Sequence, residues 1–138
     1  MARGARIGSV VIFVRDLPAS VAFYTEVLGL DVVDSSPTAA LLFSAGGAQL
    51  ILRAMGREAG HPLGSVGVQY VVWTAAGPDD LDRCERALKE RAAYRETRRS
   101  AGATVVEGRD PDDILLVVVY PGPDEFPLHE IPVRIYGW

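Results

Sequence analysis

The feature that most constrains the fold of this chain is the stretch of residues 7–30, IGSVVIFVRDLPASVAFYTEVLGL. Residues 7–14 are β-branched and aromatic with almost no polar side chains, which is typical of a strand covered on both faces. Asp16 is placed to cap a helix, Pro18 suits the first helical turn, and Gly29 suits a left-handed helix end. The sequence therefore predicts a β-strand followed directly by a helix.

After this helix the chain continues with short extended segments and then repeats the pattern. Three strands are expected first, at residues 30–33, 40–44 and 49–53. The order then begins again with a strand at residues 68–74 and a helix from Leu81 to about Ser100. Three further strands are expected at residues 104–107, 114–120 and 128–135. We predict a single domain, residues 1–138, with module one at about 5–54, a linker at about 55–66 and module two at about 67–138.

The two halves can be aligned by the strand that opens each of them. SVVIFV at residues 9–14 matches QYVVWT at residues 69–74, and an acidic residue followed by leucine comes after both strands. This alignment places Gln69 at the position of Ser9. Because the order of elements also agrees twice over, the chain is expected to contain a duplicated module.

Composition limits the possible classes of function. The chain has 138 residues and a formal net charge of −4, which argues against general affinity for nucleic acid or anionic membranes. Cys84 is the only cysteine and lies in the apolar stripe of the second helix, so it is expected to be an inert core residue. The N-terminus lacks the apolar segment of a signal peptide, and no apolar run is long enough to span a bilayer. We expect a cytoplasmic protein.

The longest apolar run, ILLVVVY at residues 114–120, has apolar side chains on both faces of its strand. Neither face is expected to stand open to water, because an open apolar strand promotes aggregation. One face is expected to lie against a helix. The other is expected to be covered by the contents of a pocket, by closure of the sheet or by a dimer partner.

Residues 10–30 contain the pattern VRDLxxSVxFYxxVLGL, which resembles the first module of the vicinal oxygen chelate superfamily. This superfamily includes glyoxalase I, extradiol dioxygenases, fosfomycin resistance enzymes and bleomycin resistance proteins. The resemblance implies an α+β fold of two βαβββ modules, whose mixed sheet curls around a cavity with the helices on the convex face. It also implies a homodimer.

The resemblance further implies where metal ligands would lie. Members that use a metal place a His or Gln on the first strand of each module and a Glu on the last strand. In this chain the corresponding positions are predicted to hold Ser9 and Ile51 in module one, and Gln69 and Glu130 in module two. Gln69 and Glu130 alone are a poor set of ligands, because Zn²⁺ prefers about four ligands that include nitrogen or sulfur, and Mg²⁺ prefers near-octahedral oxygen. No metal or other cofactor is therefore expected, and a divalent metal held by Gln69 and Glu130 is the alternative.

A ligand-binding pocket is predicted from the alternation of side chains along the first strand of each module. Val11 and Phe13 share a face with Ser9, and Val71 and Trp73 share a face with Gln69. With Ile51 and Glu130, these residues are predicted to bind a flat, largely apolar ligand. The alternative is that Phe13 and Trp73 only fill the core.

Two functions remain open at this point. The first is a binding protein of the glyoxalase and bleomycin resistance type, which sequesters a hydrophobic or aromatic natural product or antibiotic without turnover. The second is a lyase, isomerase or dioxygenase of the same superfamily, dependent on a metal or on Glu130 as general base. The loss of a metal ligand at Ser9 and at Ile51 favours the binding protein.

Overall fold

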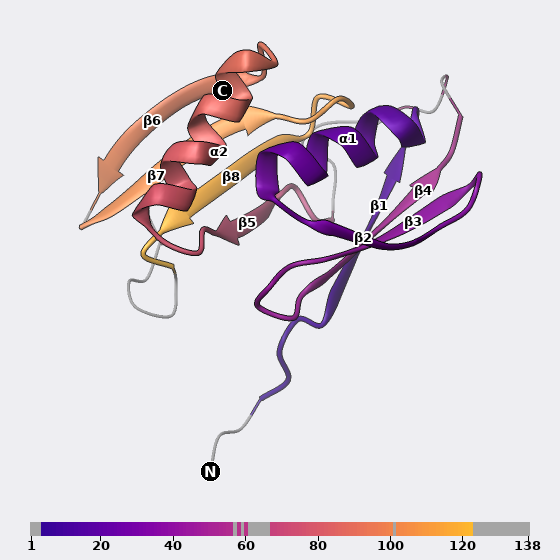
Figure 1. Cartoon of the computed structure of the whole chain (residues 1–138), viewed down its shortest axis with the longest axis horizontal. Coiled ribbons are helices and arrows are strands. Elements are labelled where there is room, and N and C mark those ends of the chain that lie inside the picture. The colour runs from indigo at the N-terminus through magenta and orange to yellow at the C-terminus, as the bar shows by residue number, and fades with distance from the viewer. Residues whose placement is uncertain (1–3, 57, 59, 61–66, 101, 123–138) are drawn as a thin grey trace. The chain divides into compact units, whose positions relative to one another are not determined.

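The computed structural model describes residues 4–56, 58, 60, 67–100 and 102–122. The chain divides into two units, each of which has one helix and a four-stranded sheet. The first unit comprises Met1–Gln69 together with Asp110–Ile114, and the second comprises Tyr70–Arg109 and Leu115–Trp138. Both units have the element order βαβββ, as predicted, so the fold is α+β with two similar modules (Figure 1).

The first unit consists of the elements β1 (Ser9–Val14), α1 (Leu17–Leu28), β2 (Asp31–Ser35), β3 (Ala39–Phe43) and β4 (Gln49–Ala54). Its strands lie in the order β1-β4-β3-β2. Strand β1 runs parallel to β4, and the other neighbours are antiparallel, so the sheet is mixed. A parallel β1–β4 pair is what a helical crossover and two hairpins between them produce.

Helix α1 begins and ends where the sequence predicts. The Asp16 side chain accepts a hydrogen bond from the Ala19 amide at 3.1 Å, and Pro18 lies in the first turn. Gly29 ends the helix in the left-handed conformation, with φ 69°. The helix lies against β3 and β4, where Leu42, Leu50 and Leu52 are at most 1 % exposed. One face of the first sheet is therefore the core of this unit.

The second unit consists of the elements β5 (Val71–Thr74), α2 (Pro78–Glu90), β6 (Tyr94–Ser100), β7 (Ala103–Arg109) and β8 (Leu115–Tyr120). Its strands lie in the order β5-β8-β7-β6, which is the order of the first sheet repeated. Leu81, Cys84 and Leu88 form the buried stripe of α2. The helix lies against β7 and β8.

The prediction that the second helix continues to about Ser100 is wrong. Helix α2 ends at Glu90, and the chain turns at Ala92, which has a left-handed φ of 55°. The next residues, YRETRRS, form β6 at the edge of the sheet. Charged side chains in this stretch suit the solvated face of a helix, but they are equally suited to an edge strand. Consequently β6, β7 and β8 complete the second module, and the strand predicted at residues 128–135 lies outside the described residues.

Candidate functional site

The face of the first sheet opposite α1 carries most of the residues predicted for module one. Side chains alternate between the two faces along β1. The less exposed Val10, Ile12 and Val14 face α1, so Ser9, Val11 and Phe13 point to the opposite face. Ser9 pairs with Gln49, Val11 with Ile51 and Phe13 with Arg53. We call this surface the open face; its residues are Ser9, Val11, Phe13, Ala39, Leu41, Phe43, Gln49, Ile51 and Arg53.

The open face is mostly apolar and is accessible to solvent. Val11 is 52 % exposed and Phe13 is 58 % exposed. The prediction that β1 is covered on both faces is therefore wrong. The physical reason is that only the alternate residues of β1 face the helix, while Val11 and Phe13 lie on the opposite side. Contiguous exposed apolar residues on a folded surface are uncommon and mark binding sites or interfaces. This face is therefore the first candidate site.

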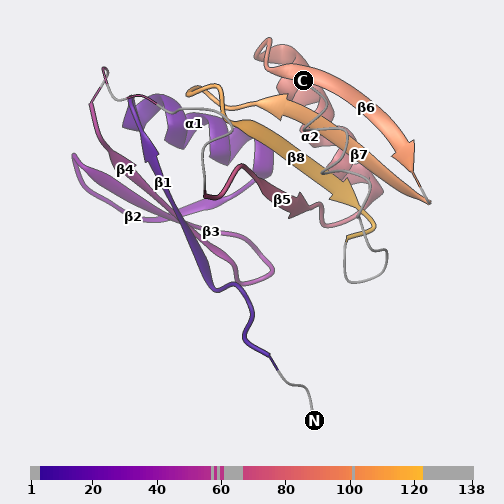
Figure 2. The ribbon, with the colours of Figure 1, turned by 180° about the vertical axis from the view of Figure 1, so that it is seen from behind.

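The corresponding face of the second sheet is closed. We call it the closed face; its core is a buried cluster of Ala103, Val105, Leu115, Val117 and Val119, with Tyr70 and Val72 packed against it. Figure 2 shows the second sheet from the side opposite α2. The helix lies on the other side, because a Cβ added at Gly108 would lie 2.8 Å from Leu88 Cδ2 of α2. Strand β8 is thus buried on both faces, as the sequence predicts.

The residues predicted for module two are placed differently from those of module one. Val71 and Trp73 do share a face. Val71 pairs with Leu116, and Leu116 pairs with Gly108, so these residues lie on the same face of the sheet. Because Gly108 lies against Leu88 of α2, Val71 and Trp73 are on the side of the sheet that α2 occupies. Gln69 precedes β5, and its amide group donates a hydrogen bond to the Gly67 carbonyl at 2.9 Å.

The difference arises from a shift of one residue between the two modules. Counted back from the helix N-caps, Asp16 and Gly77, the residue of β5 that corresponds to Val11 is Val72. Tyr70, not Gln69, then corresponds to Ser9. Because strand side chains alternate, a shift of one residue exchanges the two faces. One residue separates β1 from the N-cap Asp16, whereas two residues separate β5 from the N-cap Gly77. An alignment of the two strands by sequence alone does not reveal this difference.

The closed face contains a buried ion pair that no pattern in the sequence predicts. Glu107 on β7 pairs with Arg98 on β6, and only 3 % of the Glu107 side chain and 11 % of the Arg98 side chain are exposed. Glu96 lies 3.6 Å from the same Arg98 nitrogen atom. Glu107 is the strand neighbour of Val117, so the pair adjoins the apolar cluster. A buried charge is costly unless an opposite charge lies beside it, and Arg98 and Glu107 neutralise each other in this way.

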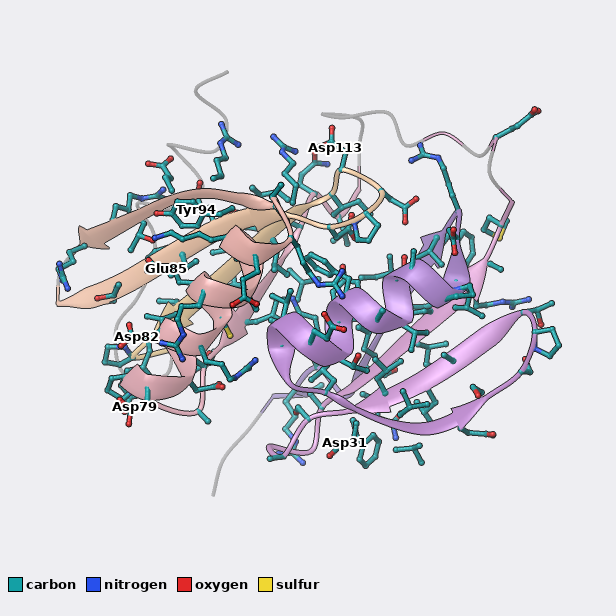
Figure 3. The ribbon with its side chains drawn as sticks, turned by 45° about the horizontal axis from the view of Figure 1, so that its top comes forward. Asp31, Asp79, Asp82, Glu85, Tyr94 and Asp113 are labelled. Carbon is teal, nitrogen blue, oxygen red and sulfur yellow. The ribbon has the colours of Figure 1, made fainter. Side chains whose placement is uncertain are left out.

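A second buried polar cluster belongs to the first unit, where the loop Asp110–Ile114 contacts α1. Tyr24 Oη donates a hydrogen bond to Asp110 Oδ2 at 2.7 Å, and Asp110 Oδ1 accepts hydrogen bonds from the amides of Asp112 and Ile114, each at 2.9 Å. Asp112 in turn accepts from the Arg15 amide at 3.1 Å. The loop turns at Asp113, labelled in Figure 3, which has a left-handed φ of 65°. The sequence showed only a polar turn here.

Burial governs the acidity of this cluster. It raises the pKa of Asp110 above its ordinary value, against the lowering effect of the hydrogen bonds from Tyr24 and the loop amides. Burial also raises the pKa of Tyr24, and the neighbouring Asp110 charge adds to the effect. Tyr24 therefore stays a neutral hydrogen-bond donor. The contacts hold the loop against α1, and they lie on the helix side of the first sheet, away from the open face.

Cys84 is buried in α2 as predicted, and burial raises the pKa of its thiol to about 11. A thiol with this pKa is protonated at neutral pH, and the thiolate is the reactive form. The residue is therefore a core side chain and not a nucleophile.

A protein-family model described as the Glyoxalase/Bleomycin resistance protein/Dioxygenase superfamily matches residues 6–118. The match covers most of the 138 residues, and the chain belongs to this superfamily. No curated protein matches the chain significantly by sequence.

Solved structures of the superfamily share the fold. A glyoxylase/bleomycin resistance protein/dioxygenase domain from Frankia sp. EAN1pec superimposes with a TM-score of 0.73 at 23 % identity, over 85 % of this chain and 98 % of that one. Lactoylglutathione lyase from Agrobacterium tumefaciens gives 0.65 at 23 % identity, over 86 % and 95 %. The fosfomycin resistance protein FosX from Mesorhizobium loti gives 0.65 at 16 % identity, over 91 % and 98 %. At these identities the likeness establishes the fold and not the chemistry.

The residues at the superfamily's metal positions do not suit a metal. In the first unit these positions hold Ser9 and Ile51. In the second unit the register places Tyr70 at the first position and Val117, the partner of Val72, at the last. None of these side chains is an imidazole, thiolate or carboxylate, the groups that hold catalytic metals. Within the described residues no group of three or more His, Cys, Asp or Glu is arranged to hold a metal ion, and Glu130 lies outside those residues.

Helices α1 and α2 are both too short to cross a membrane, and the part of the chain that the structure describes contains no other helix.

Proposed function

We propose that this protein binds a hydrophobic or aromatic small molecule, such as a natural product or antibiotic, and sequesters it without turnover. The observation that carries the proposal is the open face, a mostly apolar sheet surface on which Val11 and Phe13 are each more than half exposed. Ser9 and Ile51 would complete the contact with the ligand, with Ser9 as its polar point. In this proposal the protein is a cytoplasmic homodimer whose sheets curl around the bound molecule.

The residues at the metal positions support binding over catalysis. Ser9, Ile51, Tyr70 and Val117 include no carboxylate or imidazole that could act as a general base, and no strong metal ligand. The competing function is a lyase, isomerase or dioxygenase that uses a divalent metal or Glu130. Near-stoichiometric zinc, iron or manganese in the purified protein that disappears in Glu130→Ala would establish that alternative.

The test uses the neutral fluorescent probe N-phenyl-1-naphthylamine, whose emission rises in apolar surroundings. The wild-type protein is expected to bind it, and Phe13→Ala is expected to weaken binding about tenfold, because the variant loses ring stacking and apolar contact area. Thermal stability should stay the same, since Phe13 is 58 % exposed.

The matched control is Val68→Ala, which truncates an apolar residue that is 80 % exposed and lies outside the sheets. Its affinity for the probe should equal that of the wild type. If the probe does not bind, or binds equally to wild type and Phe13→Ala, the open face is not the binding site and the proposal fails.

A further inference from the structure

The open face carries a cation next to its most exposed aromatic residue. Arg53 on β4 is the direct strand neighbour of Phe13, which is 58 % exposed. On its other side, Arg53 pairs with Ala39 of β3. Arg53 alternates with the buried Leu52, so its side chain lies on the open face and is exposed to solvent. An arginine in this position can lie beside a ring stacked on Phe13 and reach an acidic group that the ring carries.

Arg53 has no ion-pair or hydrogen-bond partner among the described residues, in contrast to Arg15, Arg83 and Arg98, which pair with carboxylates. A guanidinium group has five N–H donors in a planar fork that matches a carboxylate or sulfonate. The donors of Arg53 are thus available to a ligand that lies on the face.

The acidic residues of the same face are distant from Arg53. Asp31, labelled in Figure 3, and Asp34 lie on β2, and they pair with Phe43 and Leu41. Strand β2 is two strands away from β4, which places its backbone about 10 Å from that of Arg53. The face therefore has a positive end at Arg53 and a negative edge at β2, separated by apolar side chains.

We propose that the open face selects an aromatic anion, with its ring on Val11 and Phe13 and its carboxylate or sulfonate on Arg53. The inference rests on the proposed function, because it names the class of ligand for the same surface. The charge pattern sets the orientation of the ligand, since the acidic group is attracted to Arg53 and repelled from Asp34.

Two probes with the same ring system separate the two proposals. N-phenyl-1-naphthylamine is neutral, and 8-anilino-1-naphthalenesulfonate adds one anionic group to the same rings. At one ionic strength, the wild type is expected to bind the sulfonate more tightly than the neutral probe. Arg53→Gln is expected to weaken sulfonate binding about three- to fivefold, the size expected for an exposed ion pair, and to leave the neutral probe unaffected. Arg53→Lys should retain most of the sulfonate affinity.

Arg95→Gln is the matched control, because it removes the same charge from an exposed residue of β6 in the second unit. It should leave the affinity for both probes unchanged. If Arg53→Gln and Arg95→Gln affect the sulfonate equally, the selection for an anion is refuted, while neutral-probe binding that depends on Phe13 still supports the proposed function. If neither probe binds, both proposals fail.

Discussion

The two sheets have the same strand order, yet the face opposite the helix is open in the first unit and closed in the second. On the open face Val11 is 52 % exposed, whereas Val117 and Val105 on the closed face are 0 % exposed. The difference begins in the sequences of the corresponding strands β4 and β8. Strand β4 places Gln49 and Arg53 on the open face, whereas β8 places Leu115, Val117 and Val119 on the closed face. Duplicated modules of one fold can thus leave a surface exposed in one copy and bury the same surface in the core of the other.

The largest expected effect concerns the charges that only the closed face buries. Glu107→Gln removes one charge of the Arg98 pair and should lower the free energy of unfolding by about 3 kcal/mol, because a buried charge loses its partner. Glu96, 3.6 Å from Arg98, keeps the loss at the lower end of that range. Urea denaturation measures the change.

The double variant Arg98→Met with Glu107→Leu serves as the control for the ion pair. It should recover most of the lost stability, because removal of both charges leaves neither one unpaired. Arg53→Gln on the open face should change stability by less than about 0.5 kcal/mol. A loss of similar size for Arg53→Gln and Glu107→Gln would contradict the distinction between the two faces.

A smaller effect is expected from the same truncation on each face. Val117→Ala should cost about 2 kcal/mol, because it removes buried methyl groups and leaves a cavity. Val11→Ala should cost less than about 0.5 kcal/mol, since that side chain is half exposed. The two variants are compared by their denaturation midpoints at a common m-value. Equal losses would mean that the open face is covered in solution, as it would be in a tight homodimer.

The last prediction tests which side of the second sheet α2 occupies. A Cβ at Gly108 would lie 2.6 Å from the Ala93 carbonyl oxygen and 2.8 Å from Leu88 Cδ2, so Gly108→Ala should cost about 1 to 3 kcal/mol through overpacking. Gly8→Ala is the control, because nothing lies within 4 Å of a Cβ at that position. If Gly108→Ala is as stable as Gly8→Ala, the helix does not contact this face, and the open and closed surfaces of the second unit need reassignment.

The sequence predicted the elements that depend on neighbouring residues. The limits of α1 follow from Asp16 and Gly29, which act within one helical turn, and the face shared by Ser9, Val11 and Phe13 follows from strand alternation. Strand β6 was not predicted, because its charged residues are compatible with either a helix or an edge strand. Only pairing with β7 decides between them.

Contacts between distant residues were beyond the reach of sequence patterns. Tyr24 and Asp110 are 86 positions apart, and no local pattern in the sequence connects them. The register of β5 was misjudged for a similar reason, since Gln69 and Tyr70 are equally acceptable matches to Ser9 by sequence. The pairing of Val72 with Val117 fixes the register only once both strands are in place.

The loop Asp110–Ile114 also bears on how this protein could be divided or recombined. The loop lies between β7 and β8 of the second unit in sequence, yet it belongs to the first unit through Tyr24 and Arg15. A fragment that ends at Gln69 would deprive the buried Tyr24 hydroxyl group of its Asp110 carboxylate, a loss that costs stability. The two halves of the duplication are therefore no longer interchangeable cassettes. A chimera with another superfamily member must inherit α1 and this loop from the same parent.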